Sequence, residues 1–147
     1  MDSPRVEFAL LADRAEAVNG KLYVLGGAWD RITVQDFSQP VVISFAVSII
    51  VPWNACNEEH TLSVKLLDDD GQPAGAEVEG AFNAGRPPSL ARGEEQRVLI
   101  AVPAMPVQLP RAGGYLVLVG IDGAEQMRVR FRATPPGQVV AQGTPPS

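Results

Sequence analysis

Residues 114–133 read GYLVLVGIDGAEQMRVRFRA, and they carry the clearest structural pattern in the chain. Apolar residues alternate with other residues on both sides of Asp122-Gly123, first over 115–121 and again over 127–133. Period-two alternation around an Asp-Gly pair is typical of a β-hairpin. The stretch therefore predicts two antiparallel strands joined by a tight turn.

The length of the turn sets which side chains share a face. Residues opposite each other across an antiparallel pair lie on the same side of the sheet, so a two-residue loop would place Val117 against Arg128. We therefore expect an odd-length loop such as residues 122–124. This register turns the alternating arginines outward, and it pairs Tyr115 with Phe131, Val117 with Val129, and Val119 with Met127.

Other alternating segments bring the expected number of strands to about eight. In residues 41–51 large side chains alternate with small ones, so we expect the large ones to face the core and the small ones to face a neighbouring segment. Residues 5–12 predict a strand followed by a helical turn or loop at 13–17, and residues 21–34 predict one long, bent strand. The remaining strands are expected at 60–68, 77–83, 96–102 and 107–109, with a short helical turn after Pro52 capped by Asn54.

The chain shows no hydrophobic period of a helix of three turns or more, and it has no repeat of 20 to 50 residues. The architecture that fits these observations is two antiparallel sheets packed face to face. We therefore expect an all-β, two-layer sandwich of immunoglobulin-like, C2-like or jelly-roll topology. Gly114-Tyr115 at the start of a late strand is compatible with a tyrosine corner. Residues 1–133 are expected to form one domain, and 134–147 a flexible tail containing proline and glycine.

Composition narrows the class of protein. The 147 residues carry a net charge of −5 and no run of five like charges, which argues against nucleic acid as a partner. A single cysteine excludes an internal disulfide. The first residues are too charged for a secretion signal or membrane segment, so we expect a cytoplasmic protein with no membrane partner. The excess of arginine over lysine suggests a GC-rich bacterial genome.

Three carboxylates in one turn form the candidate cation site. Asp68, Asp69 and Asp70 precede Gly71, and a hard cation such as Ca²⁺ could collect oxygens there. The EF-hand spacing is absent and no second acidic loop is evident, so a solvated acidic turn is the favoured interpretation and no cofactor is expected.

His60 and Cys56 are the candidates for catalysis. His60 stands next to two glutamates and could act as a general base, and Cys56 could be paired with it as a nucleophile. No third activating group or oxyanion loop accompanies them. A histidine at the start of a strand and a semi-buried thiol are the favoured interpretations, and we expect no enzyme.

Loop residues of types enriched at protein interfaces provide a further candidate. Trp53 and Asn54 follow a proline at the end of a strand, and Arg86 and Pro87 stand in a rigid Gly-Arg-Pro-Pro loop. Trp29 is a fifth candidate. Core packing is the favoured interpretation for both tryptophans, and a simple rigid turn explains Arg86 equally well.

The motifs FALLAD (8–13), NGKLYVLGGAWD (19–30), VPWN (51–54) and GRPP (85–88) occur together. Together with residues 109–132, they resemble a bacterial family of uncharacterised single-domain proteins known as a domain of unknown function. The resemblance spans residues 5–133. It implies no activity and marks no catalytic positions.

These observations favour a non-enzymatic interaction or structural module that binds a protein partner or itself. A free sheet edge, or the loops around Trp53 and Arg86, would supply the contact. A domain that binds a small ligand, either carbohydrate or calcium, is the alternative.

Overall fold

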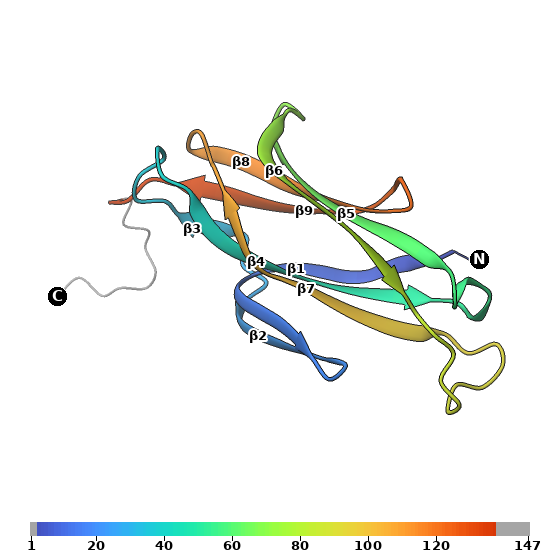
Figure 1. The fold of residues 1–147 in the computed structure, drawn as a ribbon. Helices are drawn as coiled ribbons and strands as arrows, with labels where there is room; N and C mark the ends of the chain where they lie inside the picture. Colours follow the sequence, from blue (N-terminus) through green and yellow to red (C-terminus); the bar gives the residue numbers. More distant parts are fainter. Residues whose placement is uncertain (1–2, 138–147) are drawn as a thin grey trace.

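The computed structural model describes residues 3–137, which form nine strands in two layers (Figure 1). A short 3-10 turn, η1 (Trp53–Ala55), follows the fourth strand. The strands are β1 (Arg5–Val18), β2 (Lys21–Gly27), β3 (Arg31–Thr33), β4 (Val41–Val51), β5 (Glu59–Asp68), β6 (Pro73–Asn83), β7 (Gln96–Val107), β8 (Gly113–Ile121) and β9 (Ala124–Thr134).

One sheet has the order β2-β1-β4-β7 and the other the order β3-β9-β8-β5-β6. All neighbouring strands are antiparallel except β3 and β9, which are parallel. The sets β1-β4-β7 and β9-β8-β5-β6 correspond to strands A-B-E and G-F-C-C′ of an immunoglobulin-like sandwich. The prediction of an all-β, two-layer fold is confirmed.

The core lies between the two sheets and follows the predicted alternation. Phe45, Val47, Val117 and Val119 are fully buried in it. Phe131 stacks on Tyr115 with ring centroids 5.6 Å apart. Since each strand alternates between its two faces, the apolar residues of β4, β8 and β9 meet in one dry layer.

The β8–β9 hairpin has the predicted pairs, Tyr115 with Phe131, Val117 with Val129 and Val119 with Met127. The predicted loop length is wrong. Asp122 and Gly123 alone form the loop, with φ angles of 51° and 84° that suit a type I′ turn. A β-bulge restores the register, because Gly120 pairs with Glu125 and leaves Gln126 as an extra residue.

A tyrosine corner is present at the start of β8. The Tyr115 hydroxyl donates a 2.6 Å hydrogen bond to the Arg111 carbonyl. The Arg111 N–H donates a 3.2 Å hydrogen bond to the Tyr115 hydroxyl oxygen. Tyr115 is buried, so these bonds satisfy a phenol that would otherwise lack a partner in the core. The contact fixes the entry of the chain into β8.

β4 is buried on both faces from Ile43 to Val51. Its large side chains point into the core, as predicted, and its small ones lie under the β1–β2 hairpin. Ala46 contacts Ala12 and Ala15 there, and half-buried Leu22 and Val24 of β2 cover them. Although β2 and β7 lie at opposite ends of the sheet order, they come into contact, which shows that the hairpin folds back over the outer face.

Two fully buried serines on this outer face of β4 are hydrogen-bonded. Ser44 donates to the Pro103 carbonyl, and Ser48 donates to the Glu7 carboxylate. Arg97 also holds Glu7, through two contacts of 2.7 Å. The hydrogen bonds from Arg97 and Ser48 lower the pKa of Glu7 to about 2. Glu7 is therefore ionised at neutral pH.

Several predicted boundaries are wrong. Residues 13–17 are not a helical turn or loop but continue β1, because this alanine-rich segment bends over β4. Residues 21–34 are not one strand: β2 ends at Gly27, Ala28 has a φ of 64°, and β3 belongs to the other sheet. Residues 96–107 form one strand instead of two, and Asn54 is not a cap, since Pro52 precedes η1.

β9 is the last strand of the described residues. β9 runs to Thr134, which pairs with Thr33 of β3. The Thr134 carbonyl accepts a 2.9 Å hydrogen bond from the Val34 N–H. Most of the predicted tail, from residue 138 onward, lies outside the described residues.

We expect Ala46→Leu to lower the free energy of unfolding by about 1–3 kcal/mol, because a larger side chain cannot fit beneath the hairpin. Ala17→Leu, at an exposed position of β1, is the matched control and is expected to change it by less than about 0.5 kcal/mol. Urea denaturation of both variants measures the difference. Equal effects would show that the outer face of β4 tolerates bulk.

Candidate interaction surface

Exposed large apolar side chains concentrate on the β1–β2 hairpin. Phe8, Val18, Tyr23 and Leu25 belong to it, and only Val42 of β4 is exposed to a comparable degree elsewhere in residues 3–137. Tyr23 is 56% exposed and Leu25 is 69% exposed. Tyr23 and Leu25 share one face of β2, and exposed apolar side chains that lie together are typical of a contact site.

The local sequence sets the geometry of this hairpin. Asn19 and Gly20 form its two-residue loop, with φ angles of 51° and 75°, and Val18 pairs with Lys21. This is a type I′ turn, whose flanking residues form a hydrogen-bonded pair. Hydrogen-bonded and non-hydrogen-bonded pairs then alternate along the two strands, so the backbone of Tyr23 bonds to β1. The backbone N–H and C=O groups of its neighbours Leu22 and Val24 point away from β1, toward the free edge.

The two faces of β2 differ in the same alternating way. Leu22 and Val24 pack against the outer face of β4, whereas Tyr23 and Leu25 point to solvent. Tyr23 lies opposite Glu16, and Leu25 lies opposite Arg14. These four residues line a shallow hollow of about 370 Å³. The result is an apolar centre with one charge of each sign beside it.

The four sheet edges of the sandwich are β2, β3, β6 and β7. β3 has three residues, β6 begins with a proline and carries Glu77 and Glu79, and β7 contains Pro103 and Pro106. Short length, charge and proline all discourage the pairing of an edge with another chain. β2 has no proline and no acidic residue. It is therefore the edge best suited to accept another strand.

The structure brings Trp53 and Arg86 together. The Arg86 guanidinium lies 4.2 Å from the centre of the Trp53 ring and donates hydrogen bonds of 2.6 and 3.2 Å to the Trp53 carbonyl. This stacking ties the loop after β6 to η1. Asn54 and Pro87 are exposed beside the pair. Because Arg86 already has two partners, its main contact is within the chain.

Trp29 is half-buried in a different setting. Its ring meets Phe131 edge-on, with centroids 5.9 Å apart, and it packs against the main core. Its indole N–H is buried without a hydrogen-bond partner in the described part of the chain. Core packing accounts for its position.

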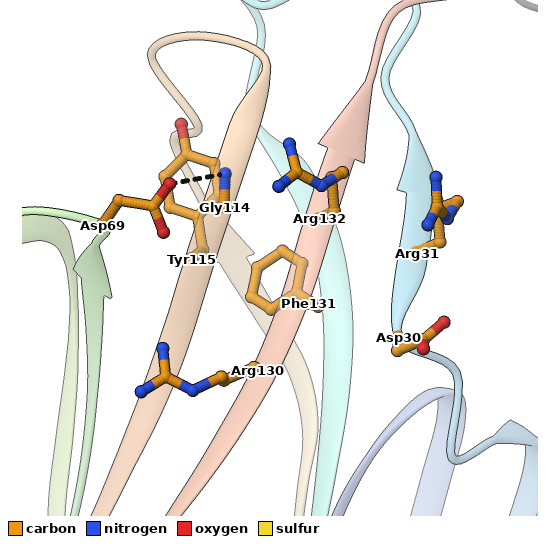
Figure 2. Close-up of a pocket in the computed structure, with 8 residues that line it drawn as sticks. All are labelled: Asp30, Arg31, Asp69, Gly114, Tyr115, Arg130, Phe131 and Arg132. Carbon is orange, nitrogen blue, oxygen red and sulfur yellow. Dashed lines mark hydrogen bonds between the residues drawn. The ribbon is translucent and has the colours of Figure 1, made fainter.

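The three aspartates at the β5–β6 turn differ in their surroundings. Asp68 accepts hydrogen bonds from the N–H groups of Asp70 and Gln72, and Asp69 accepts one from Gly114 (Figure 2). Asp70 is exposed. Within residues 3–137 no group of three or more His, Cys, Asp or Glu side chains is placed to hold a metal ion.

His60 is buried and engaged through both ring nitrogens. Nδ1 lies 2.8 Å from an Asp122 carboxylate oxygen, and Nε2 lies 2.8 Å from the Ala55 carbonyl. Because both partners are acceptors, this geometry suits a doubly protonated imidazole. Burial lowers the pKa of His60, but the bonds to Ala55 and Asp122 outweigh it and raise the pKa above its ordinary value.

Asp122 completes this contact from the β8–β9 turn. Its second oxygen accepts a 2.9 Å hydrogen bond from the Thr61 N–H. Burial raises the pKa of Asp122, and the bonds to His60 and Thr61 outweigh that effect and lower it. Neither nitrogen of His60 is available to take a proton from a nucleophile. Cys56 is also buried, and its thiol contacts the Pro52 carbonyl.

The strand order and the tyrosine corner define an immunoglobulin-like β-sandwich protein, and the functional candidate is an exposed hairpin edge. The chain belongs to a family of unknown function (DUF6941), whose model matches residues 7–134. This membership confirms the resemblance to a domain of unknown function. No helix in residues 3–137 has the length and apolar character needed to cross a membrane.

No curated protein matches this chain. Among solved structures, it is similar to the Pseudomonas fluorescens alkylpurine DNA glycosylase AlkC, bound to DNA containing an abasic site analogue. The sequence identity is 8% and the TM-score is 0.48. The similarity covers 89% of this chain and 30% of the glycosylase chain. A likeness of this degree carries no information on activity.

The His60–Asp122 contact predicts how stability depends on pH. A raised pKa in the folded state stabilises the fold fully below the unfolded value of about 6.5, and this contribution is lost as pH rises through the folded-state value. We therefore expect the free energy of unfolding to fall as pH rises from about 6.5 to the folded-state pKa of His60, and this contribution to level off above it. His60→Gln is expected to remove this slope in urea denaturation at a series of pH values.

His60 is the one histidine of the chain, so its NMR titration needs no assignment. The pKa is expected above 6.5 in the native protein and lower in Asp122→Asn, which keeps the side-chain shape and tolerates a positive φ. A native His60 that titrates at or below 6.5 would contradict the charged pair.

Proposed function

We propose that this chain is a non-catalytic interaction module that self-associates by pairing the β2 edges of two copies. The observation that carries the proposal is the free edge of β2, on which Tyr23 and Leu25 are exposed. Edges with unpaired N–H and C=O groups accept a further strand. The hairpin thus offers backbone bonds and apolar contact at the same place.

A two-fold axis beside Tyr23 would give hydrogen-bond partners to the outward backbone groups along the free edge of β2. In an antiparallel pairing centred there, Leu22 of each copy lies opposite Val24 of the other, and these residues point their backbone groups outward. They become hydrogen-bonded pairs, whereas Tyr23 and its symmetry mate form the close, non-hydrogen-bonded pair between them. Leu25 then lies opposite Lys21 of the second copy. Aromatic pairs of this kind stabilise paired strands.

A second copy is the partner that the observations favour. The exposed face of the hairpin holds Arg14, Glu16 and Lys21, so its charge is close to balanced, although the whole chain carries −5. Two identical faces can therefore approach without strong repulsion. A strand paired antiparallel with itself also needs no second, complementary surface, which is the property of a two-fold dimer interface.

The proposal places the protein in the bacterial cytoplasm, without a nucleic-acid or membrane partner. The lone thiol is buried and the described chain has no disulfide, which suits a reducing compartment. The net charge of −5 argues against binding to a phosphate backbone.

Light scattering at two well-separated protein concentrations tests the dimer. We expect a mass of twice 15.6 kDa at the higher concentration. Tyr23→Lys/Leu25→Lys should give 15.6 kDa there, because it places two lysines against each other across the two-fold axis. Both positions are exposed, so the fold is expected to survive, as circular dichroism would show.

Val42→Lys is the matched control, since Val42 is 60% exposed but lies on β4. It should remain dimeric. Val24→Pro tests the backbone hydrogen bonds between the two copies and should also give a monomer. It removes an outward N–H that the pairing of β1 with β2 does not use. A native chain that stays at 15.6 kDa, or a dimer that survives the lysine variant, excludes this interface.

A further inference from the structure

Three arginines gather on the outer face of the other sheet. Arg130 and Arg132 are two residues apart on β9, so they share a face, and Arg31 is the direct partner of Arg132 on β3. All three are exposed. In Figure 2, Arg130 and Arg132 extend from β9 toward β8, while Arg31 stands on β3 on the opposite side.

This arrangement costs stability in the absence of a ligand. Like charges directly opposite each other on paired strands are destabilising. Arg128, at the start of the same row, is paired with Glu125 at 2.6 Å. No ion pair or side-chain hydrogen bond within residues 3–137 involves Arg31, Arg130 or Arg132. Three guanidinium groups that start from adjacent positions on β9 and β3 therefore remain without an anion, and because Arg31 lies on the other side of β9 in Figure 2, the exposed side chains must turn toward one another to share a ligand.

The arginines border a hollow of about 350 Å³. Gly114 of β8 also lines it and lies opposite Arg132. The Gly114 N–H donates a 3.2 Å hydrogen bond to Asp69, and a Cβ at Gly114 would overlap that carboxylate. Asp30 lies at the β3 side of the hollow. The arginine side chains that line the hollow are thus accompanied by two carboxylates, Asp30 and Asp69.

We propose that Arg31, Arg130 and Arg132 bind the phosphate group of a small phosphate monoester. A guanidinium pairs with phosphate oxygens through parallel N–H bonds, and three such groups match the three terminal oxygens of a monoester. Asp30 and Asp69 are placed to accept hydrogen bonds from hydroxyl groups on the rest of the ligand. The hollow holds a small molecule, and the site is independent of β2 and of self-association.

Thermal unfolding with added ligands tests this site, since a compound that binds only the native state raises its melting temperature. The probes are inorganic phosphate, glycerol 3-phosphate, glycerol, and sodium chloride at equal ionic strength. We expect both phosphates to raise the melting temperature above that in chloride, and glycerol to have no effect. A larger shift with the ester assigns the ligand as an ester, and an equal shift assigns it as free phosphate.

Arg130→Gln and Arg132→Gln are each expected to weaken phosphate binding about tenfold, and Arg128→Gln, the matched control on the same strand, by less than about twofold. Without phosphate, Arg132→Gln should melt at a slightly higher temperature than the native chain, because it removes the like-charge pair with Arg31. That readout separates a loss of binding from a loss of folding.

Three results would overturn the site. The first is a native protein that responds to phosphate no more than to chloride. The second is an equal loss of binding in Arg128→Gln, which would indicate a general charge effect. The third is tighter binding of a DNA oligonucleotide than of the monoester with the same dependence on Arg130 and Arg132, which would point to a nucleic-acid surface.

Discussion

β4 is buried on both faces, and the positions of both sheets and of the β1–β2 hairpin follow from this burial. Its large residues fill the space between the sheets, so β5, β8 and β9 must pack above them. Its small residues leave room for a second layer on the outside, where Ala46 lies under the bent end of β1 and under β2. Close packing tolerates little change of volume, so the size of these side chains fixes where the hairpin lies.

The position of the hairpin in turn determines which parts of β2 are exposed. One face of the strand, with Leu22 and Val24, is used to cover β4, and the other face has no cover within the described chain. The candidate interaction surface is therefore the reverse side of a structural contact. The arginine cluster follows the same logic on the other sheet, where the inner face of β9 supplies Phe131 to the core and its outer face carries the charges.

Sequence patterns predicted the features that are set by residues close together in the chain. The alternation around Asp122 gave the correct pairs of the final hairpin, and the large–small alternation of residues 41–51 gave both faces of β4. The loop length failed because a bulge at Gln126 compensates for a shorter turn, and alternation alone does not distinguish these two solutions. Residues 13–17 were predicted as a helical turn or loop, but they continue β1, and Ala15 is small because another strand lies close by.

Contacts between distant segments could not be read from the chain. Trp53 and Arg86 were predicted as separate loop candidates, and only the fold shows that one side chain stacks on the other. The arginine row was expected to face outward, but its third member, Arg31, joins it through a parallel pairing of β3 with β9 across about a hundred residues. The turn between Gly27 and Arg31, which moves the chain from one sheet to the other, makes that pairing possible.

The prolines of β7 have a consequence for assembly. Two chains joined at β2 form one continuous sheet of eight strands, and both ends of that sheet are then β7 strands. Pro103 and Pro106 have no backbone N–H to donate along those edges, so a further chain is discouraged from pairing with β7. In the proposed dimer, growth would stop at a closed pair and not proceed to a filament, so one edge could pair without the risk of polymerisation.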